Sequence, residues 1–202
     1  KRLAARLNEM RSLASSDYMA RMDADDLIAP TRIAKQLEVL MANPEMDLVS
    51  TGVCSLSDDC EPVGIRCVEP GHAINARALL GGRSGIVHAS LLGRKAWFER
   101  NHYDETLPIS QDTNLWVRAY SRGDLNAAFV PEPLYFYRED ANVSSRKLLL
   151  AYRIGRQSIL RDAGSRFSLM DKAAAYAASA GRSMAVRVLD TMGRMDMIRA
   201  RR

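Results

Sequence analysis

The chain has 202 residues, of which 47% are hydrophobic and 26% are charged, and its formal net charge is +5 at pH 7. These values are ordinary for a soluble globular protein with one core and a small appendage. The sequence has no signal-peptide pattern and no apolar run of about 18 residues, so it predicts no membrane span. The three cysteines, Cys54, Cys60 and Cys67, lack C-x-x-C spacing. They predict neither a disulfide framework nor a zinc site, and they favour a reducing cytoplasm.

Charge is unevenly distributed along the chain. Residues 1–145 hold 16 Lys/Arg and 20 Asp/Glu, whereas residues 146–202 hold 13 and 4, so the two parts carry net charges of −4 and +9. The basic part has helical periodicity. A basic helical segment can contact an anionic lipid surface or nucleic acid, or it can simply form a solvated face.

Helices and strands are predicted to alternate from the start of the chain, which favours an α/β sheet. Boundaries follow Pro, Gly and Asn signals. The first predicted elements are a helix at 2–14, a buried strand at 18–22, a helix opened by Pro30 and Thr31, a strand at 47–53 and a hairpin or loop at 54–70. They are followed by a helix at 73–80, a strand at 86–92 that contains His88, helices at 94–100 and 112–122, and two strands at 127–130 and 134–137 around Pro131-Glu132-Pro133. Helices are predicted from Ser145 onward, with breaks near Gly164 and Gly181.

Three carboxylates, Asp23, Asp25 and Asp26, follow the predicted strand at 18–22 directly. Like charges at the end of a buried strand are costly unless a cation lies beside them. Hard divalent ions such as Mg²⁺ or Mn²⁺ prefer carboxylate oxygens. Open α/β sheets bind ligands at the carboxyl ends of their strands. The cluster therefore predicts a site that binds a diphosphate through a metal ion.

Five motifs follow one another along the chain, after a helix that carries Leu7-Asn8. They are Tyr18-Met-Ala-Arg-Met-Asp-Ala-Asp-Asp26, Pro30-x-Arg32-x-x-x-Gln36, Asp47-Leu-Val-Ser-Thr-Gly52, Ser110-Gln-Asp112-x-x-Leu-Trp116-x-Arg118 and Pro131-Glu-Pro-Leu-x-x-Tyr137-Arg138. In order and spacing these motifs resemble the family 2 glycosyltransferases of GT-A fold, and the resemblance covers roughly residues 3 to 145.

The resemblance implies an α/β fold with a GT-A-like (Rossmann-like) mixed sheet flanked by helices. It divides the chain into a partial catalytic domain at 1–145 and a basic helical C-terminal segment at 146–202. It also implies that the family's first strands and nucleobase pocket lie outside this sequence, which would then be a fragment of a longer gene product with an exposed sheet edge.

The resemblance implies metal-dependent, inverting transfer of a sugar from a UDP- or dTDP-sugar to a glycan or lipid-linked hydroxyl acceptor. The expected cofactor is Mn²⁺ or Mg²⁺, and the setting is bacterial surface polysaccharide synthesis. The enzyme would be cytoplasmic, with residues 146–202 holding it on the inner face of the membrane, and nucleic acid is not an expected partner. The implied roles are Asp112 as catalytic base, Asp25 and Asp23 as metal ligands, Asp23, Asp25, Arg138, Arg21 and Asn8 at the donor, and His88 and Trp116 at the acceptor.

A purely structural role is also open to several of these residues. Asp112 fits the N-cap of a helix at 112–122. Asp26 fits two roles equally well, as a cap of the turn that follows it and as a metal ligand. Gln111 replaces the Glu that usually precedes the base in the family. His88 also fits a core histidine, Trp116 a packing residue, Asn8 a polar position on a helix surface, and Arg21 a counter-charge to the aspartates.

Protein classes outside this family fit less well. An EF-hand loop starting at Asp23 would have Ile28 and Ala34 where Gly and Glu are needed. A phosphatase with an Asp nucleophile does not explain the motifs from Gln111 to Arg138, and a sugar nucleotidyltransferase would need a glycine-rich phosphate loop. The second function open to the chain is that of an inactive glycosyltransferase fragment that only binds partners.

Overall fold

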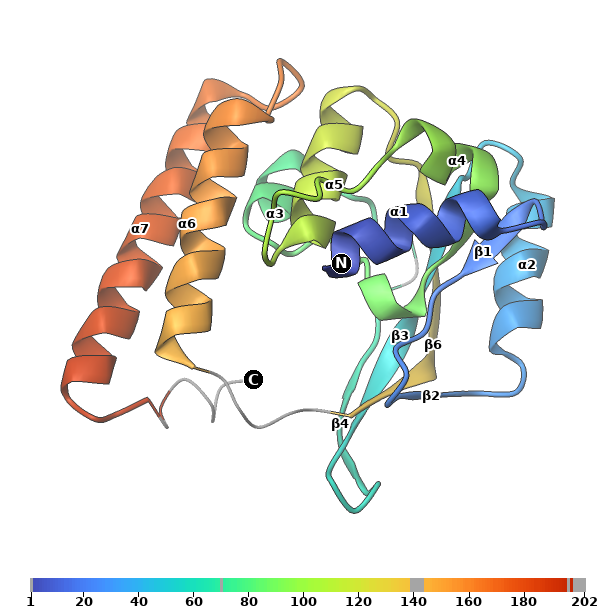
Figure 1. The fold of residues 1–202 in the computed structure, drawn as a ribbon, viewed down its shortest axis with the longest axis horizontal. Coiled ribbons are helices and arrows are strands. Elements are labelled where there is room, and N and C mark those ends of the chain that lie inside the picture. The colour runs from blue at the N-terminus through green and yellow to red at the C-terminus, as the bar shows by residue number, and fades with distance from the viewer. Residues whose placement is uncertain (1, 70, 139–143, 196, 198–202) are drawn as a thin grey trace.

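The structure is a computed structural model that describes residues 2–69, 71–138, 144–195 and 197. A mixed sheet with helices on both faces lies beside a pair of long C-terminal helices (Figure 1). The elements in chain order are α1 (Leu3–Leu13), β1 (Tyr18–Ala20), β2 (Leu27–Ile28), α2 (Arg32–Ala42), β3 (Leu48–Leu56), β4 (Pro62–Arg66), α3 (Ala76–Leu80), a 3₁₀ turn (His88–Ser90), β5 (Leu92–Arg94), α4 (Lys95–Arg100), α5 (Gln111–Ser121), β6 (Ala127–Arg138), α6 (Ser145–Arg161) and α7 (Leu169–Thr191).

The sheet has the strand order β1-β5-β3-β6-β2, and β4 pairs with the distal part of β3. Strands β3 and β6 are parallel, whereas the other pairs are antiparallel. Every residue of β3 is buried, as expected for a strand covered on both faces. Leu48 belongs to the core cluster under α1, α4 and α5, while Val49 joins Leu40 of α2 on the other face. This architecture confirms the predicted α/β class.

The predicted strands at 127–130 and 134–137 form one strand, β6. The pairing with β3 passes from Thr51↔Val130 to Gly52↔Pro133, so Pro131 and Glu132 bulge out of the ladder. A Cβ on Gly52 would lie 2.7 Å from the Pro131 carbonyl oxygen. Glycine at this position therefore allows the Pro-containing segment to stay inside a continuous strand.

The strand predicted at 86–92 is wrong in position. His88–Ser90 form a 3₁₀ turn, and β5 begins only at Leu92. Serine hydroxyls replace the ladder here: the Ser90 Oγ accepts from the Thr51 N–H at 3.1 Å, and the Ser50 Oγ accepts from the Val87 N–H at 2.9 Å. These side-chain bonds join residues 39 and 37 positions apart and satisfy backbone N–H groups in place of strand pairing.

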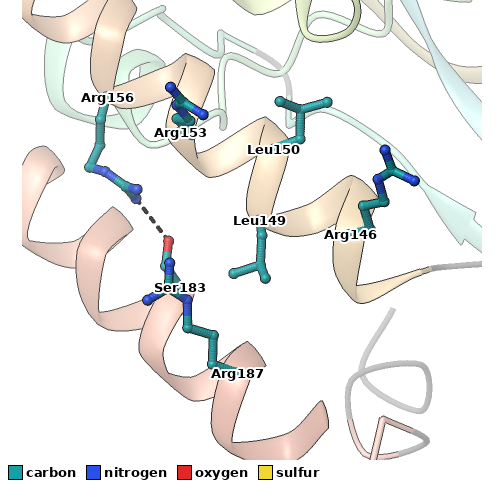
Figure 2. A pocket seen from close by; sticks show the side chains of 7 residues that line it. All are labelled: Arg146, Leu149, Leu150, Arg153, Arg156, Ser183 and Arg187. Carbon is teal, nitrogen blue, oxygen red and sulfur yellow. Dashed lines mark hydrogen bonds between the residues drawn. The ribbon is translucent and has the colours of Figure 1, made fainter.

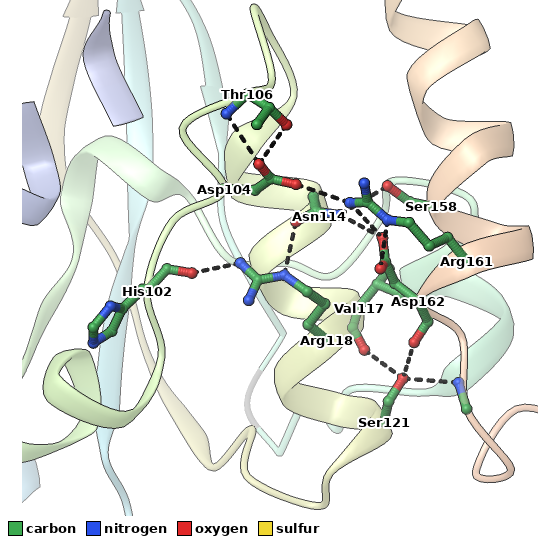
Figure 3. Close-up of polar contacts among 11 residues, drawn as sticks. His102, Asp104, Thr106, Asn114, Val117, Arg118, Ser121, Ser158, Arg161 and Asp162 are labelled. Carbon is green, nitrogen blue, oxygen red and sulfur yellow. Dashed lines mark hydrogen bonds and ion pairs between the residues drawn. The ribbon is translucent and has the colours of Figure 1, made fainter. Parts of the chain in front are cut away.

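The C-terminal helices are attached to the α/β part through α5. The Asn114 amide of α5 donates to the Ser158 hydroxyl at 2.9 Å and to the Asp162 carboxylate at 2.7 Å, and the Ser121 hydroxyl donates to the Asp162 carbonyl (Figure 3). Phe167 and Ala175 belong to the same core cluster as α5. The predicted break near Gly181 is wrong, because α7 runs through it. Within the described residues, no helix combines the length and the apolar character that crossing a bilayer requires.

Candidate functional site

The aspartate cluster forms a turn between β1 and β2. Asp26 is 4% exposed, and its two oxygens accept from the Tyr135 hydroxyl at 2.6 Å and from the Arg138 backbone N–H at 2.9 Å. The Tyr135 hydroxyl in turn accepts from the Asp23 N–H at 3.0 Å. Asp26 therefore fixes the aspartate turn to the carboxyl end of β6, and the N–H that it binds belongs to that distant strand rather than to the turn that follows it.

The other two aspartates are less enclosed. The Arg21 guanidinium pairs with the Asp23 Oδ1 at 2.7 Å, and this leaves the Asp23 Oδ2 uncommitted in that ion pair. Asp25 is exposed and, among the described residues, has no hydrogen-bond or ion-pair partner. The pair with Asp23 shows that Arg21 balances charge in the cluster, as its structural role predicts.

The donor set fits a metal ion that binds together with a phosphorylated substrate. Within the described part of the chain, no three His, Cys, Asp or Glu side chains cluster as a complete metal site. Mg²⁺ typically takes only one or two carboxylates and completes its shell with waters and substrate phosphates. The exposed Asp25 carboxylate, with the free oxygen of Asp23 beside it in sequence, matches that smaller requirement.

Behind the turn lies a buried polar network centred on Arg32, which is 0% exposed. Its guanidinium donates to the carbonyls of Arg21 at 2.9 Å and Leu91 at 3.2 Å and to the Gln36 side chain at 2.9 Å. Gln36 donates to the carbonyls of Val49 and Ser90. Burial lowers the pKa of Arg32 to about 10, and no carboxylate among the described residues pairs with it. Arg32 and Gln36 therefore tie the end of β1 to β3 and β5.

A second group of side chains, Tyr103 and His88, lies within the electrostatic influence of Arg21. The Tyr103 hydroxyl and the His88 Nε2 are 2.7 Å apart. Burial, and after it the positive charge of Arg21, lower the pKa of His88 to about 3, so the ring is neutral and shares a hydrogen bond with the Tyr103 hydroxyl. Burial raises the pKa of Tyr103, the charge of Arg21 opposes this, and the charge of Asp112 adds to it. Arg21 and Asp112 thus both act on the Tyr103–His88 pair.

Asn8 positions that pair. Its amide nitrogen donates to the Tyr103 carbonyl at 3.0 Å and to the Glu105 carboxylate at 2.9 Å, and its oxygen accepts from the Tyr103 N–H at 3.0 Å. Both amide hydrogens are used in these bonds, so Asn8 acts within the fold on Tyr103.

Asp112 lies in the first turn of α5. The helix begins one residue earlier than predicted, at Gln111, and its N-cap is Ser110, which has a left-handed φ of 57° and makes no side-chain cap. The predicted N-cap role of Asp112 is therefore wrong. No described residue bonds to its carboxylate, and the neighbouring Gln111 Oε1 is buried without a hydrogen-bond partner in the described structure.

The remaining predicted site residues lie in two different settings. Trp116 is 2% exposed and packs edge-on against His88, with ring centroids 5.9 Å apart. Arg138 brings its backbone to Asp26, while its exposed guanidinium donates to the Cys60 Sγ at 3.4 Å.

Sequence reasoning missed Tyr135 and Tyr103, which connect the predicted residues to one another. It included Arg32 and Gln36 only as members of a motif. The available signal was their type and spacing, since an Arg and a Gln four residues apart share one helix face.

Two curated relatives match much of the chain. The "Putative glycosyltransferase EpsE" of Bacillus subtilis (strain 168) is 27% identical over 150 residues, which make up 73% of this chain and 52% of that protein. The "Uncharacterized glycosyltransferase MJ1057" of Methanocaldococcus jannaschii is 26% identical over 131 residues, 65% of this chain and 45% of that protein. The chain thus spans about half the length of the curated relatives it matches. No protein-family model matches it.

Solved structures share the fold. A crystal structure of S. aureus TarS has a TM-score of 0.55 at 15% identity, over 88% of this chain and 50% of that one. The mannosyltransferase PcManGT from Pyrobaculum calidifontis, in complex with GDP-Man and Mn²⁺, has a TM-score of 0.51 at 19% identity, over 94% and 58%. The chain is therefore similar in sequence to two proteins named as glycosyltransferases, and it shares its fold with TarS and with the mannosyltransferase PcManGT.

Proposed function

We propose that the protein transfers a sugar from a nucleotide-diphosphate donor to a hydroxyl acceptor, in a metal-dependent reaction that inverts the anomeric centre. The observation that carries this proposal is the position of Arg21, which interacts both with the aspartate turn and with the Tyr103–His88 pair. This arginine pairs with Asp23 of the aspartate turn, and its charge also acts on the Tyr103–His88 pair next to Asp112. Solved structures of TarS with UDP and of PcManGT with GDP-Man and Mn²⁺ support a nucleotide-sugar donor.

On the donor side, Asp25 and the free oxygen of Asp23 would hold Mn²⁺ or Mg²⁺. When bound, such an ion neutralises charge on a departing diphosphate as a Lewis acid. Arg21 holds the Asp23 side chain in place through their ion pair. The exposed Arg138 guanidinium can pair bidentately with a phosphate, because the weak acceptor Cys60 is the partner that it would give up.

On the acceptor side, Asp112 is the proposed general base. An inverting displacement needs one group to take the acceptor proton on the face opposite the leaving group. The Asp112 carboxylate lies in the first turn of α5 and is free of partners among the described residues. His88 is proposed to face the acceptor, with Trp116 packed against its ring.

The proposed setting is bacterial surface polysaccharide synthesis at the cytoplasmic face of the membrane. Residues 146–202, with their net charge of +9, would hold the enzyme near anionic lipid, where lipid-linked acceptors reside.

A donor screen on the intact protein tests the reaction. UDP-, dTDP- and GDP-sugars would be supplied with Mn²⁺ or Mg²⁺ and candidate acceptors, and release of nucleoside diphosphate would be measured. We expect release with one donor class and its loss on chelation with EDTA. Binding of no nucleotide sugar in calorimetry, with or without metal, contradicts the proposal.

A further inference from the structure

The paired C-terminal helices contain a groove rich in arginine. Its volume is about 360 Å³, within the range of roughly 300–1,000 Å³ that is usual for ligand pockets. Figure 2 shows its lining from both helices, with the Arg156 guanidinium of α6 reaching the Ser183 hydroxyl of α7 at 2.8 Å. The lining residues are Arg146, Leu149, Leu150, Arg153, Arg156, Ser183 and Arg187.

The guanidinium groups of this groove have no anionic partner in the described part of the chain. Arg156 donates to the Ser179 and Ser183 hydroxyls, which are neutral. Arg146, Arg153 and Arg187 are exposed and have no ion pair with a described residue. Four like charges around one groove repel one another unless an anion lies between them, and guanidinium groups match the geometry of phosphate oxygens.

An apolar surface adjoins the groove on α7. The buried side of this helix carries small residues such as Ser179 and Ser183. On the opposite side, large apolar side chains recur at helical spacing and are exposed, and Val188 follows Arg187 in the sequence. These exposed residues are Met170, Met184, Val188 and Met192.

Exposed apolar side chains bordered by unpaired arginines are the pattern of a helix that lies in the lipid headgroup layer. Basic residues near an anionic leaflet are attracted to it, and apolar side chains on the same helix gain by leaving water. We propose that the α6–α7 pair is a docking surface for an anionic phospholipid membrane. The arginine groove takes a lipid phosphate, and the exposed face of α7 enters the headgroup region.

This inference locates the proposed membrane contact and rests on the proposed function for its purpose. Its test contains no sugar donor, so its failure is distinct from a failure of the transferase proposal. The 202-residue chain would be sedimented with phosphatidylglycerol–phosphatidylcholine vesicles and with pure phosphatidylcholine vesicles. Inorganic pyrophosphate and a single-stranded oligonucleotide would be titrated in parallel to distinguish a lipid surface from a free phosphate or a nucleic acid.

Two double variants test the two parts of the surface. Arg153→Gln with Arg187→Gln should weaken partitioning onto anionic vesicles about tenfold, because each basic side chain near the surface contributes. Its charge-matched control is Arg77→Gln with Arg83→Gln, two exposed arginines in and just after α3. Met184→Gln with Val188→Gln should weaken binding several-fold. Its control is Val63→Gln with Ile65→Gln, which are 62% and 64% exposed on β4.

We expect wild-type binding to anionic vesicles alone, weakened by both α6–α7 variants and retained by both controls, with unchanged thermal midpoints in circular dichroism. Equal binding by the groove variant and wild type overturns the proposal. So does equal loss in the charge-matched control, or tight binding of the oligonucleotide without binding of vesicles. Self-association that disappears in the Met184/Val188 variant, without vesicle binding, assigns the α7 face to a second copy instead.

Discussion

The aspartate turn and the α6–α7 groove differ in how the fold treats charge. At the turn, Asp26 is held by Tyr135 and by the β6 backbone, and Asp23 is paired with Arg21. In the groove, the arginines have no anionic partner in the described chain. Charges that are paired within the protein hold its conformation, whereas charges without an internal partner are available to bind a ligand. Among the described carboxylates of the candidate site, Asp25 and Asp112 share the unpartnered state of the groove arginines.

The largest expected effect concerns Asp112. Asp112→Asn should lower kcat by about 10²–10⁴-fold, the usual contribution of a general base. Donor affinity should stay the same, because the donor contacts lie at the aspartate turn. Kinetics with the donor found in the screen, together with calorimetric donor binding, check this. Asp190→Asn, an exposed carboxylate on α7, is the control. Retained turnover in the Asp112 variant would remove its assignment as base.

The second effect tests whether the Arg32 network stabilises the fold around the aspartate turn. Arg32→Met leaves the Arg21 carbonyl and the Gln36 Oε1 without their donor, and each unsatisfied buried group costs about 1–3 kcal/mol. We expect a loss of about 2–4 kcal/mol in the free energy of unfolding by urea titration. Lys35→Met, which breaks an exposed ion pair from the same helix to Glu132, should cost about 1 kcal/mol or less. Equal losses would mean that the Arg32 network adds no specific stability.

The third effect is a pH dependence from His88. Its folded-state pKa of about 3 lies below the ordinary value of 6.5. Between these values the unfolded chain binds a proton that the folded chain does not, so stability should fall as the pH is lowered from 6.5 toward 3. His88→Gln should flatten this part of the curve of unfolding free energy against pH, whereas His102→Gln, at an exposed position, should leave it unchanged. An unaltered slope in the His88 variant contradicts the assignment.

The smallest effect belongs to the groove. Arg153→Gln removes one of several repelling charges and no described hydrogen bond. We expect the free energy of unfolding to stay within about 0.5 kcal/mol or to rise slightly. Urea titration beside the Arg32 variant checks this. A loss of about 2 kcal/mol or more, of the order of a broken buried network, would show that the fold itself depends on the groove charge.

Much of the architecture was predictable from local signals. The helices starting near Leu3 and Pro30 and the buried strand after Asp47 followed from apolar periodicity and capping residues. The errors lie where a long-range contact overrides a local signal. The Pro131 bulge is tolerated only because Gly52 on the neighbouring strand leaves room for it, and spacing along the chain carries no record of such a partner.

The candidate site shows the same limit. Motif order brought Asp23, Asp112 and Arg138 into one hypothesis, yet it assigned Asn8 to the donor, whereas its amide is engaged by Tyr103 and Glu105. Tyr135 and Tyr103 could not be found from spacing, because their bonds to Asp23, Asp26 and Asn8 join residues 95 to 112 positions apart. Sequence patterns indicate which side chains could take part in binding or catalysis. The fold determines which of those side chains are already engaged in hydrogen bonds within the protein.

The bonds around Asp26 also bear on the thermodynamics of binding. A donor that reaches the aspartate turn meets backbone positions that were ordered when the chain folded, because the Tyr135 hydroxyl and the Arg138 N–H already hold them. The entropy of ordering this turn is therefore not subtracted from the binding free energy of the donor. Its carboxylates also need little reorganisation as charge develops on a leaving group. Part of the protein's affinity for its ligand is thus set by the folding reaction, well before any ligand is present.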